Sequence, residues 1–71
     1  MIERRFHREL YPTAAIDGAV QVFARFARFE QADEGDYRVI RITAARPERE
    51  RKVALELSNY ALGLTRRGGL S

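Results

Sequence analysis

The sequence lacks several residue types on which disulfides and metal sites depend. It contains no cysteine and one histidine, so it can form neither a disulfide nor a thiolate metal site, and a lone histidine does not build a zinc site. No segment approaches the roughly 18 apolar residues of a membrane-spanning helix, and the stretch MIERRFHREL lacks the apolar core of a signal peptide. We therefore expect a cytoplasmic protein without cofactor, metal or membrane contact.

Catalytic side chains are equally scarce. Nucleophilic catalysis needs a nucleophile, a base and a group that orients the base. The chain offers only Ser58 within a helical stretch, Ser71 and an isolated His7. The pair Gly68–Gly69 follows a helical pattern, whereas a phosphate-binding glycine loop precedes its helix. The sequence therefore predicts no enzymatic activity.

The residues that are present predict one small folded domain. The 71 residues are 45% hydrophobic and 32% charged, a composition typical of folded proteins. We expect a single domain over residues 1–71, ordered over 1–67 and with a frayed tail at 68–71. A domain of this size buries only about 60% of the surface of its unfolded chain. Extra stability from a partner protein or a second copy is therefore expected, and a homodimer is the first prediction.

Alternating polarity predicts three strands. Residues 2–10 alternate, with Phe6 and Leu10 on the side expected to be buried. Residues 28–32 and 37–44 read as a hairpin around the turn DEGD, whose residue types tolerate tight backbone geometry.

Helical periodicity predicts two helices. The first begins at Ala14, with Thr13 as its N-cap, and ends near Arg28. The second begins at Pro47, a residue favoured at the first helical position, and ends before Gly68, which can cap it.

The resulting order, β-α-β-β-α, predicts an α+β fold. The strand over 37–44 is the richest in β-branched and aromatic residues, so it is expected in the centre of the sheet. This gives a three-stranded antiparallel sheet of order 1-3-2 with both helices on one face, which resembles a ferredoxin-like fold without its last strand. The strand over 2–10 then has an open edge at which another chain can pair.

Apolar residues beside the main helical stripes form a candidate interface. Leu55 and Leu62 lie next to the stripe of the second helix, and Val22 and Phe26 widen the stripe of the first. Exposed apolar area of this kind usually marks a binding surface. The alternative is that the two helices pack on each other and bury both flanks, and the sequence leaves both interpretations open.

The uncovered sheet face offers an alternative function. It is expected to present Arg5, His7, Tyr37 and Arg41, with Val39 among them. Basic and aromatic side chains on an open sheet bind and stack bases in some RNA-binding folds, although the net charge of +3 is small for that role. We therefore expect a non-enzymatic protein/peptide-interaction module, with a small RNA/DNA-binding domain as the alternative.

Three segments resemble a known family. ELYPTAAIDGAVQVF, YRVIRIT and ELSNYAL, the last with Glu56, Asn59 and Leu62, are similar to parts of the small HxsD proteins of the His-Xaa-Ser peptide system. The resemblance spans about residues 6–65. It implies a bacterial accessory protein encoded beside radical-SAM maturases that modify a small peptide. It implies no catalytic residue in this chain, and iron–sulfur chemistry would belong to partners because this chain has no cysteine to ligate a cluster.

Overall fold

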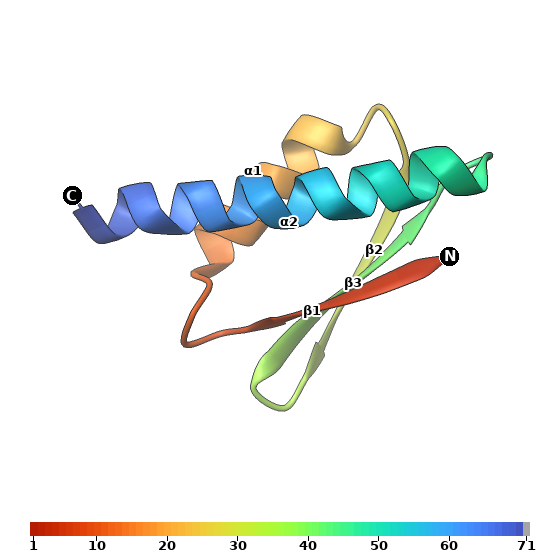
Figure 1. Cartoon of the computed structure of the whole chain (residues 1–71). Coiled ribbons are helices and arrows are strands. Elements are labelled where there is room, and N and C mark those ends of the chain that lie inside the picture. The colour runs from red at the N-terminus through yellow and green to blue at the C-terminus, as the bar shows by residue number, and fades with distance from the viewer. Residues whose placement is uncertain (71) are drawn as a thin grey trace.

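In the computed structural model the chain forms a three-stranded antiparallel sheet with two helices on one of its faces (Figure 1). The central strand β3 pairs with both β1 and β2, so the predicted α+β fold with sheet order 1-3-2 is confirmed. The structure describes residues 1–70, and of 67–70 only the backbone. The elements are β1 (Ile2–His7), α1 (Thr13–Phe23), β2 (Arg28–Glu34), β3 (Tyr37–Thr43) and α2 (Pro47–Leu70).

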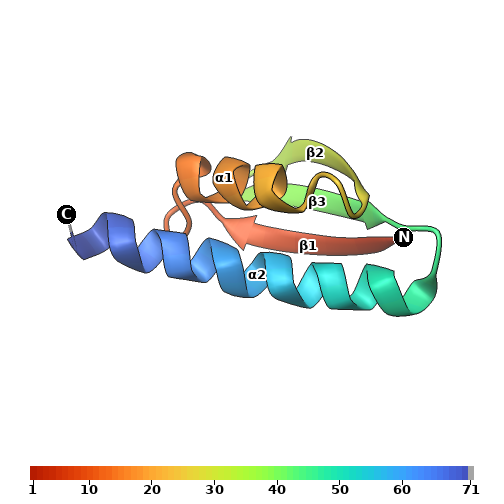
Figure 2. The same ribbon diagram turned by 90° about the horizontal axis from the view of Figure 1, so that it is seen from above.

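The two helices lie side by side over the sheet (Figure 2). The long helix α2 borders β1 and runs in the same direction as β1. The shorter helix α1 lies on the other side of α2, toward β2. In the part of the chain that the structure describes, the opposite face of the sheet carries no helix (Figure 1).

The strands differ from the prediction at their ends. β1 ends at His7 because the His7 carbonyl accepts the N–H groups of Leu10 and Tyr11, which turns the chain toward α1. Leu10 is consequently 67% exposed and not buried as predicted. β2 continues to Glu34, so the hairpin turn is only Gly35–Asp36. Gly35 has a φ of 59°, a conformation that a residue with a Cβ adopts only at a cost.

α1 also differs from the prediction at both ends. Thr13 is the first helical residue, and Pro12 precedes it without a side-chain capping bond, so Thr13 is not the N-cap. The helix ends at Phe23, where the N–H groups of Ala24 and Phe26 begin to donate to carbonyls three residues back and the chain turns toward β2. Phe26 therefore lies in a connection and not on the helix.

α2 begins at Pro47, as predicted, and a carboxylate of its first turn holds its start in place. Glu50 accepts the N–H of Ala44 at 3.1 Å, and it lies 2.7 Å from the amino group of Met1. The hydrogen bond from the Met1 amino group, followed by that from Ala44, lowers the pKa of Glu50. The Glu50 side chain is buried, and each of its carboxylate oxygens has a partner.

The far end of α2 extends past the predicted stop. The helix continues to Leu70, so Gly68 does not end it. The frayed tail stays a prediction, because Ser71 and the side chains of 67–70 lie outside the described residues. Over the part of the chain that is described, neither helix combines the length and apolar character needed to cross a membrane.

The core fills the space between the sheet and the helices. Ile40 and Ile42 of β3 point into it, as predicted. The two helices approach closely at Gly18, where an added Cβ would lie 3.1 Å from Cδ1 of Leu64. The buried core consists of Phe6, Ile16, Ala19, Ile40, Ile42, Val53, Ala54, Leu57 and Ala61.

Candidate interaction surfaces

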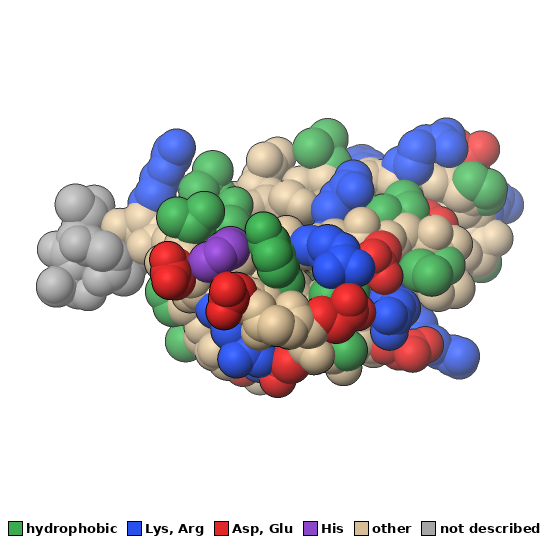
Figure 3. Space-filling model, turned by 90° about the horizontal axis from the view of Figure 1, so that it is seen from below, with side chains coloured by type: hydrophobic (Ala, Val, Ile, Leu, Met, Phe, Trp, Pro, Cys, Tyr) green, Lys and Arg blue, Asp and Glu red, His purple; other side chains and the backbone are tan. Residues whose placement is uncertain are grey.

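Charged side chains on the open face of the sheet pair into a closed ring. The Arg5 guanidinium lies 3.4 Å from a carboxylate oxygen of Glu3 and 3.2 Å from one of Glu34. The Arg41 guanidinium lies 3.3 and 3.5 Å from the same two carboxylates. This charged ring joins all three strands, since Glu34 belongs to β2, Arg41 to β3 and the other two to β1. Figure 3 shows basic and acidic side chains interspersed on this face around His7.

Val39 lies beneath the charged ring. It was predicted to face away from the helices, and it does, yet its exposed fraction is 0%. Its register neighbours are Arg5 on β1 and Ala32 on β2, and the ion pair from Arg5 to Glu34 crosses from one outer strand to the other. Long paired side chains therefore cover an apolar residue that no helix covers.

The residues predicted to bind nucleic acid do share the open face. His7 and Tyr37 are register partners, and their rings meet edge to face with centroids 5.0 Å apart. The arginines of the set, Arg5 and Arg41, belong to the charged ring. The structure thus brings the predicted residues together but places carboxylates against both guanidinium groups.

A second ionic cluster lies on the helix side of the hairpin. Arg38 donates to Asp33 at 2.7 Å and to Gln31 at 2.8 Å, and it lies 3.6 Å from Asp17 of α1. Arg8 lies 2.6 Å from Asp33. The hydrogen bonds from Arg8 and then from Arg38 lower the pKa of Asp33. This Arg38 cluster ties α1 and the end of β1 to the hairpin.

The free edge of β1 exposes backbone groups at alternate residues. Arg8 N–H donates to the Asp36 carbonyl at 2.9 Å, and this pair continues the register of β1 on β3. In an antiparallel ladder, hydrogen-bonded pairs alternate with non-hydrogen-bonded ones. Arg4 therefore turns its N–H and C=O toward β3, whereas Glu3 and Arg5 turn theirs toward the free edge.

The outer flank of α2, formed by Leu55 and Leu62, points away from α1. Successive helical residues are rotated by about 100°, so both leucines lie roughly 140–160° around the axis from Tyr60. The Tyr60 ring meets Phe23 at 5.9 Å, which marks the flank that faces α1. Leu55 is 60% exposed and Leu62 is 37% exposed. The alternative that the helices bury these leucines between them is therefore wrong.

The outer flank and the free edge of β1 lie on the same side of the molecule. α2 borders β1, with α1 on its other side (Figure 2). A chain that pairs with β1 would therefore lie on the same side of α2 as Leu55 and Leu62, away from α1.

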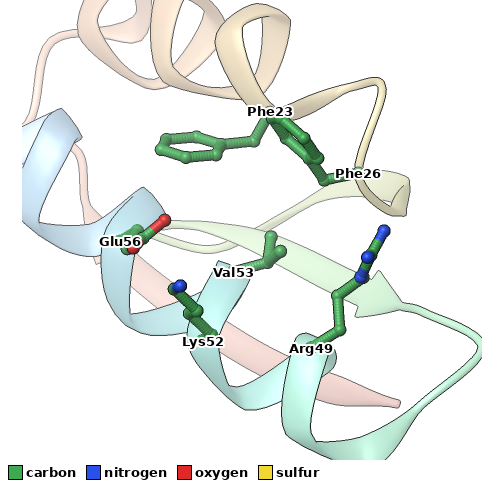
Figure 4. A pocket seen from close by; sticks show the side chains of 6 residues that line it. All are labelled: Phe23, Phe26, Arg49, Lys52, Val53 and Glu56. Atoms are coloured by element: carbon green, nitrogen blue, oxygen red, sulfur yellow. The ribbon is translucent and has the colours of Figure 1, made fainter.

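Val22 and Phe26 lie on the opposite side of α2 from the outer flank. Each is 43% exposed, so the predicted interface residues form two surfaces and not one. Phe26 borders a hollow of about 270 Å³ between the end of α1 and the first turns of α2 (Figure 4). The hollow is lined by Phe23, Phe26, Arg49, Lys52, Val53 and Glu56.

Basic side chains surround Phe26. Two more open hollows also include it, one beside Arg25 and Arg28 and the other beside Arg46 and Arg49. The Arg25 guanidinium lies 5.9 Å from the centre of the Phe26 ring. We call Arg25, Arg28, Arg46, Arg49 and Lys52 the basic cluster.

The basic cluster cannot be recognised from the sequence because its members come from separate segments. Residues 25–28 lead into β2, and residues 46–52 open α2. They meet because Arg28 pairs with Thr43, which sets the start of β2 beside the end of β3. The sequence does place arginines near the start of β2, at 25 and 28, and after the end of β3, at 46 and 49.

Comparisons with known proteins add no family to this description. No protein-family model, no curated protein and no solved structure matches the chain. The resemblance to HxsD proteins and to a ferredoxin-like fold therefore stays a prediction. Among the described residues, no group of acidic or histidine side chains is arranged to hold a metal ion.

Proposed function

We propose that the protein is a non-enzymatic interaction module that receives an extended segment of a partner at the free edge of β1, beside the outer flank of α2. The observation that carries this proposal is the 60% exposure of Leu55 on the flank of α2 away from α1, the side on which β1 has a free edge. Exposed apolar area beside an open strand edge is typical of a surface that another chain covers.

The edge and the flank contribute to binding in different ways. Main-chain hydrogen bonds at the edge set the direction and register of an added strand. The edge is short, because the His7 carbonyl is already used by the following turn. Fully burying a leucine side chain contributes about 1.5–3 kcal/mol. Leu55 and Leu62 therefore supply most of the affinity in this proposal.

A second copy of the chain fits this surface. Two β1 strands paired antiparallel through their outward-facing residues can set Glu3 of each copy opposite Arg5 of the other, and opposite charges directly across strands are favourable. We propose this homodimer as the first complex to test. From the sequence resemblance alone, we propose a component of a peptide-modification system as the second partner.

Substitution on the outer flank tests the apolar part of the surface. Leu55→Glu combined with Leu62→Glu should convert a dimer to a monomer in light scattering across a concentration series. Leu10→Glu is the matched control, since Leu10 is 67% exposed outside this surface. If the native chain is a monomer, the same variants are compared in a pull-down. Binding that survives the double substitution would contradict the proposal.

Proline substitution tests the strand edge. Arg5→Pro removes an N–H that points outward, so it should abolish strand pairing with a partner while the fold is kept. Arg4→Pro removes an N–H that points toward β3, so it should disrupt the sheet itself. Circular dichroism and light scattering separate the two results. Unchanged binding by Arg5→Pro would exclude the edge.

Nucleic-acid binding through Arg5, His7, Tyr37 and Arg41 remains the alternative proposal. Its support is the common face of these residues, and the charged ring weighs against it because both arginines already contact carboxylates. Tyr37→Ala combined with Arg41→Ala should weaken binding of a single-stranded oligonucleotide, and the affinity should fall steeply with salt. An affinity that does not change with salt would exclude this alternative.

A further inference from the structure

The basic cluster forms no ion pair with the acidic side chains that the structure describes, although Glu56 lines the same hollow as Arg49 and Lys52. None of its side chains lies within 4.0 Å of a carboxylate oxygen among the side chains that the structure describes. Arg46 and Arg49 also lie at the start of α2, where the helix dipole adds partial positive charge. Like charges that gather without counter-charges repel one another and favour the binding of an anion.

The basic cluster adjoins an apolar hollow. Figure 4 shows the rings of Phe23 and Phe26 on one side of this hollow and Val53 on the other, with Arg49 and Lys52 at its margins. The volume of about 270 Å³ is below the range of roughly 300–1,000 Å³ that is typical of small-molecule sites. A single large apolar side chain suits this space better than a cofactor does.

We propose that the basic cluster and this hollow bind an acidic segment of a partner protein, with one apolar side chain of the segment in the hollow and its carboxylates on the arginines. Arginine guanidinium groups bind carboxylates through charge-assisted and often bidentate hydrogen bonds. An apolar anchor in a pocket with a polar rim is a common arrangement at protein interfaces. This site lies across α2 from the outer flank and does not depend on the proposed function.

A protein segment is favoured over a nucleic acid at this site. Single strands are bound by stacking bases on open aromatic faces, but the Arg25 guanidinium lies over the Phe26 ring. The hollow also includes Glu56, whose carboxylate repels phosphate and peptide carboxylates alike, so the hollow itself suits only a neutral apolar side chain. Nucleic-acid binding is therefore an outcome of the test that would overturn the proposal.

Nuclear magnetic resonance titration of the ¹⁵N-labelled chain tests the site. The probe is a short peptide of aspartate and glutamate with one central phenylalanine, and the comparison probes are the same peptide with alanine in the centre and an oligothymidylate. We expect the phenylalanine peptide to shift the amide signals of residues 23–28 and 46–53 at low salt. No shift there, or tighter binding of the oligothymidylate, would overturn the proposal.

Charge reversal tests the basic cluster. Arg46→Glu combined with Arg49→Glu should lower the affinity for the phenylalanine peptide by about tenfold or more. Loss of charged contacts across an interface commonly has effects of this size. Arg66→Glu is the control, because Arg66 is exposed near the far end of α2. An equal loss with Arg66→Glu would mean attraction by net charge alone and would overturn the site.

Substitution of Phe26 tests the hollow. Phe26→Ala should lower the affinity for the phenylalanine peptide and leave the lower affinity for the alanine peptide unchanged. Only the phenylalanine peptide places a large side chain in the hollow. Phe26 is 43% exposed and lies outside the core, so the fold should be retained, and the dispersion of the amide signals checks this. An equal loss for both peptides would contradict an apolar anchor.

Discussion

The open face of the sheet and the basic cluster use the same residue type in opposite ways. On the sheet, Arg5 and Arg41 each contact both Glu3 and Glu34. Around Phe26, arginines of the segments 25–28 and 46–49 lie together without an ion pair to a carboxylate among the described side chains. The placement of the acids, more than that of the bases, therefore distinguishes a surface that stabilises the fold from one that is available for binding.

The difference follows from the secondary structure. Every second residue of a strand faces the same side, and the register fixes its neighbours on the next strand. Glu3 is thereby set directly opposite Arg41. The first turns of a helix impose no such cross-strand pairing, so Arg46 and Arg49 can lie beside Arg25 and Arg28 without a carboxylate set opposite each of them.

The largest effect is expected beneath the charged ring. Val39→Ala should lower the free energy of unfolding by about 1–3 kcal/mol, because it removes buried methyl groups and the paired side chains above cannot close the space completely. Thr43→Ala, at an exposed position on the same strand, should change it by no more than about 0.5 kcal/mol. Urea denaturation measures both. Equal effects would mean that the charged ring does not cover a packed residue.

The next effect concerns the turn that positions Glu34 in the charged ring. Gly35→Ala should lower the free energy of unfolding by about 1–2 kcal/mol, because alanine at a positive φ is strained. Asp36→Ala is the matched control, since no residue other than Gly35 has a positive φ in the part of the chain that is described. Similar losses for both substitutions would show that backbone strain is not the cause.

The order of the elements could be predicted because each has a strong period. Alternation identified β3, and Ile40 and Ile42 face the helices as this alternation requires. The burial of Val39 could not be predicted in the same way, because its cover consists of charged side chains from strands distant in the sequence. The end of α1 at Phe23 was missed because the apolar spacing continues through Phe26 after the backbone has turned.

The candidate sites were predicted less completely for a related reason. The place of Leu55 and Leu62 beside the apolar stripe could be predicted, but their exposure could not, because it depends on the side of α2 on which α1 packs. The basic cluster depends on the pairing of Arg28 with Thr43, a long-range contact that no local pattern encodes.

The Arg38 cluster contains a third case, the paired carboxylate of Asp33. Its contribution to the stability of the fold depends on pH. The pKa of Asp33 is lowered in the folded protein, first by the hydrogen bond from Arg8 and then by that from Arg38. A carboxylate with a lowered pKa contributes stability above its unfolded pKa, and this is lost as the pH falls through the folded value. Stability should therefore decline below about pH 4, and Asp33→Asn should make that decline shallower. Urea midpoints across this range measure the effect, with Glu48→Gln as the matched control. An unchanged decline in Asp33→Asn would contradict this role.

The smallest effect gives the sharpest comparison, because the same substitution should lower stability on one surface and not on the other. Arg41→Gln removes contacts with Glu3 and Glu34 and should lower the free energy of unfolding by about 0.2–1 kcal/mol, as expected for exposed ion pairs. Arg49→Gln removes one cation from a group that repels itself, so it should leave stability unchanged or raise it slightly. Both effects should shrink in high salt, since salt screens attraction and repulsion alike. Urea denaturation at low and high salt measures this. Equal losses for the two variants at low salt would show that the basic cluster is not under repulsion, and the physical reason for an anionic partner at Phe26 would then disappear.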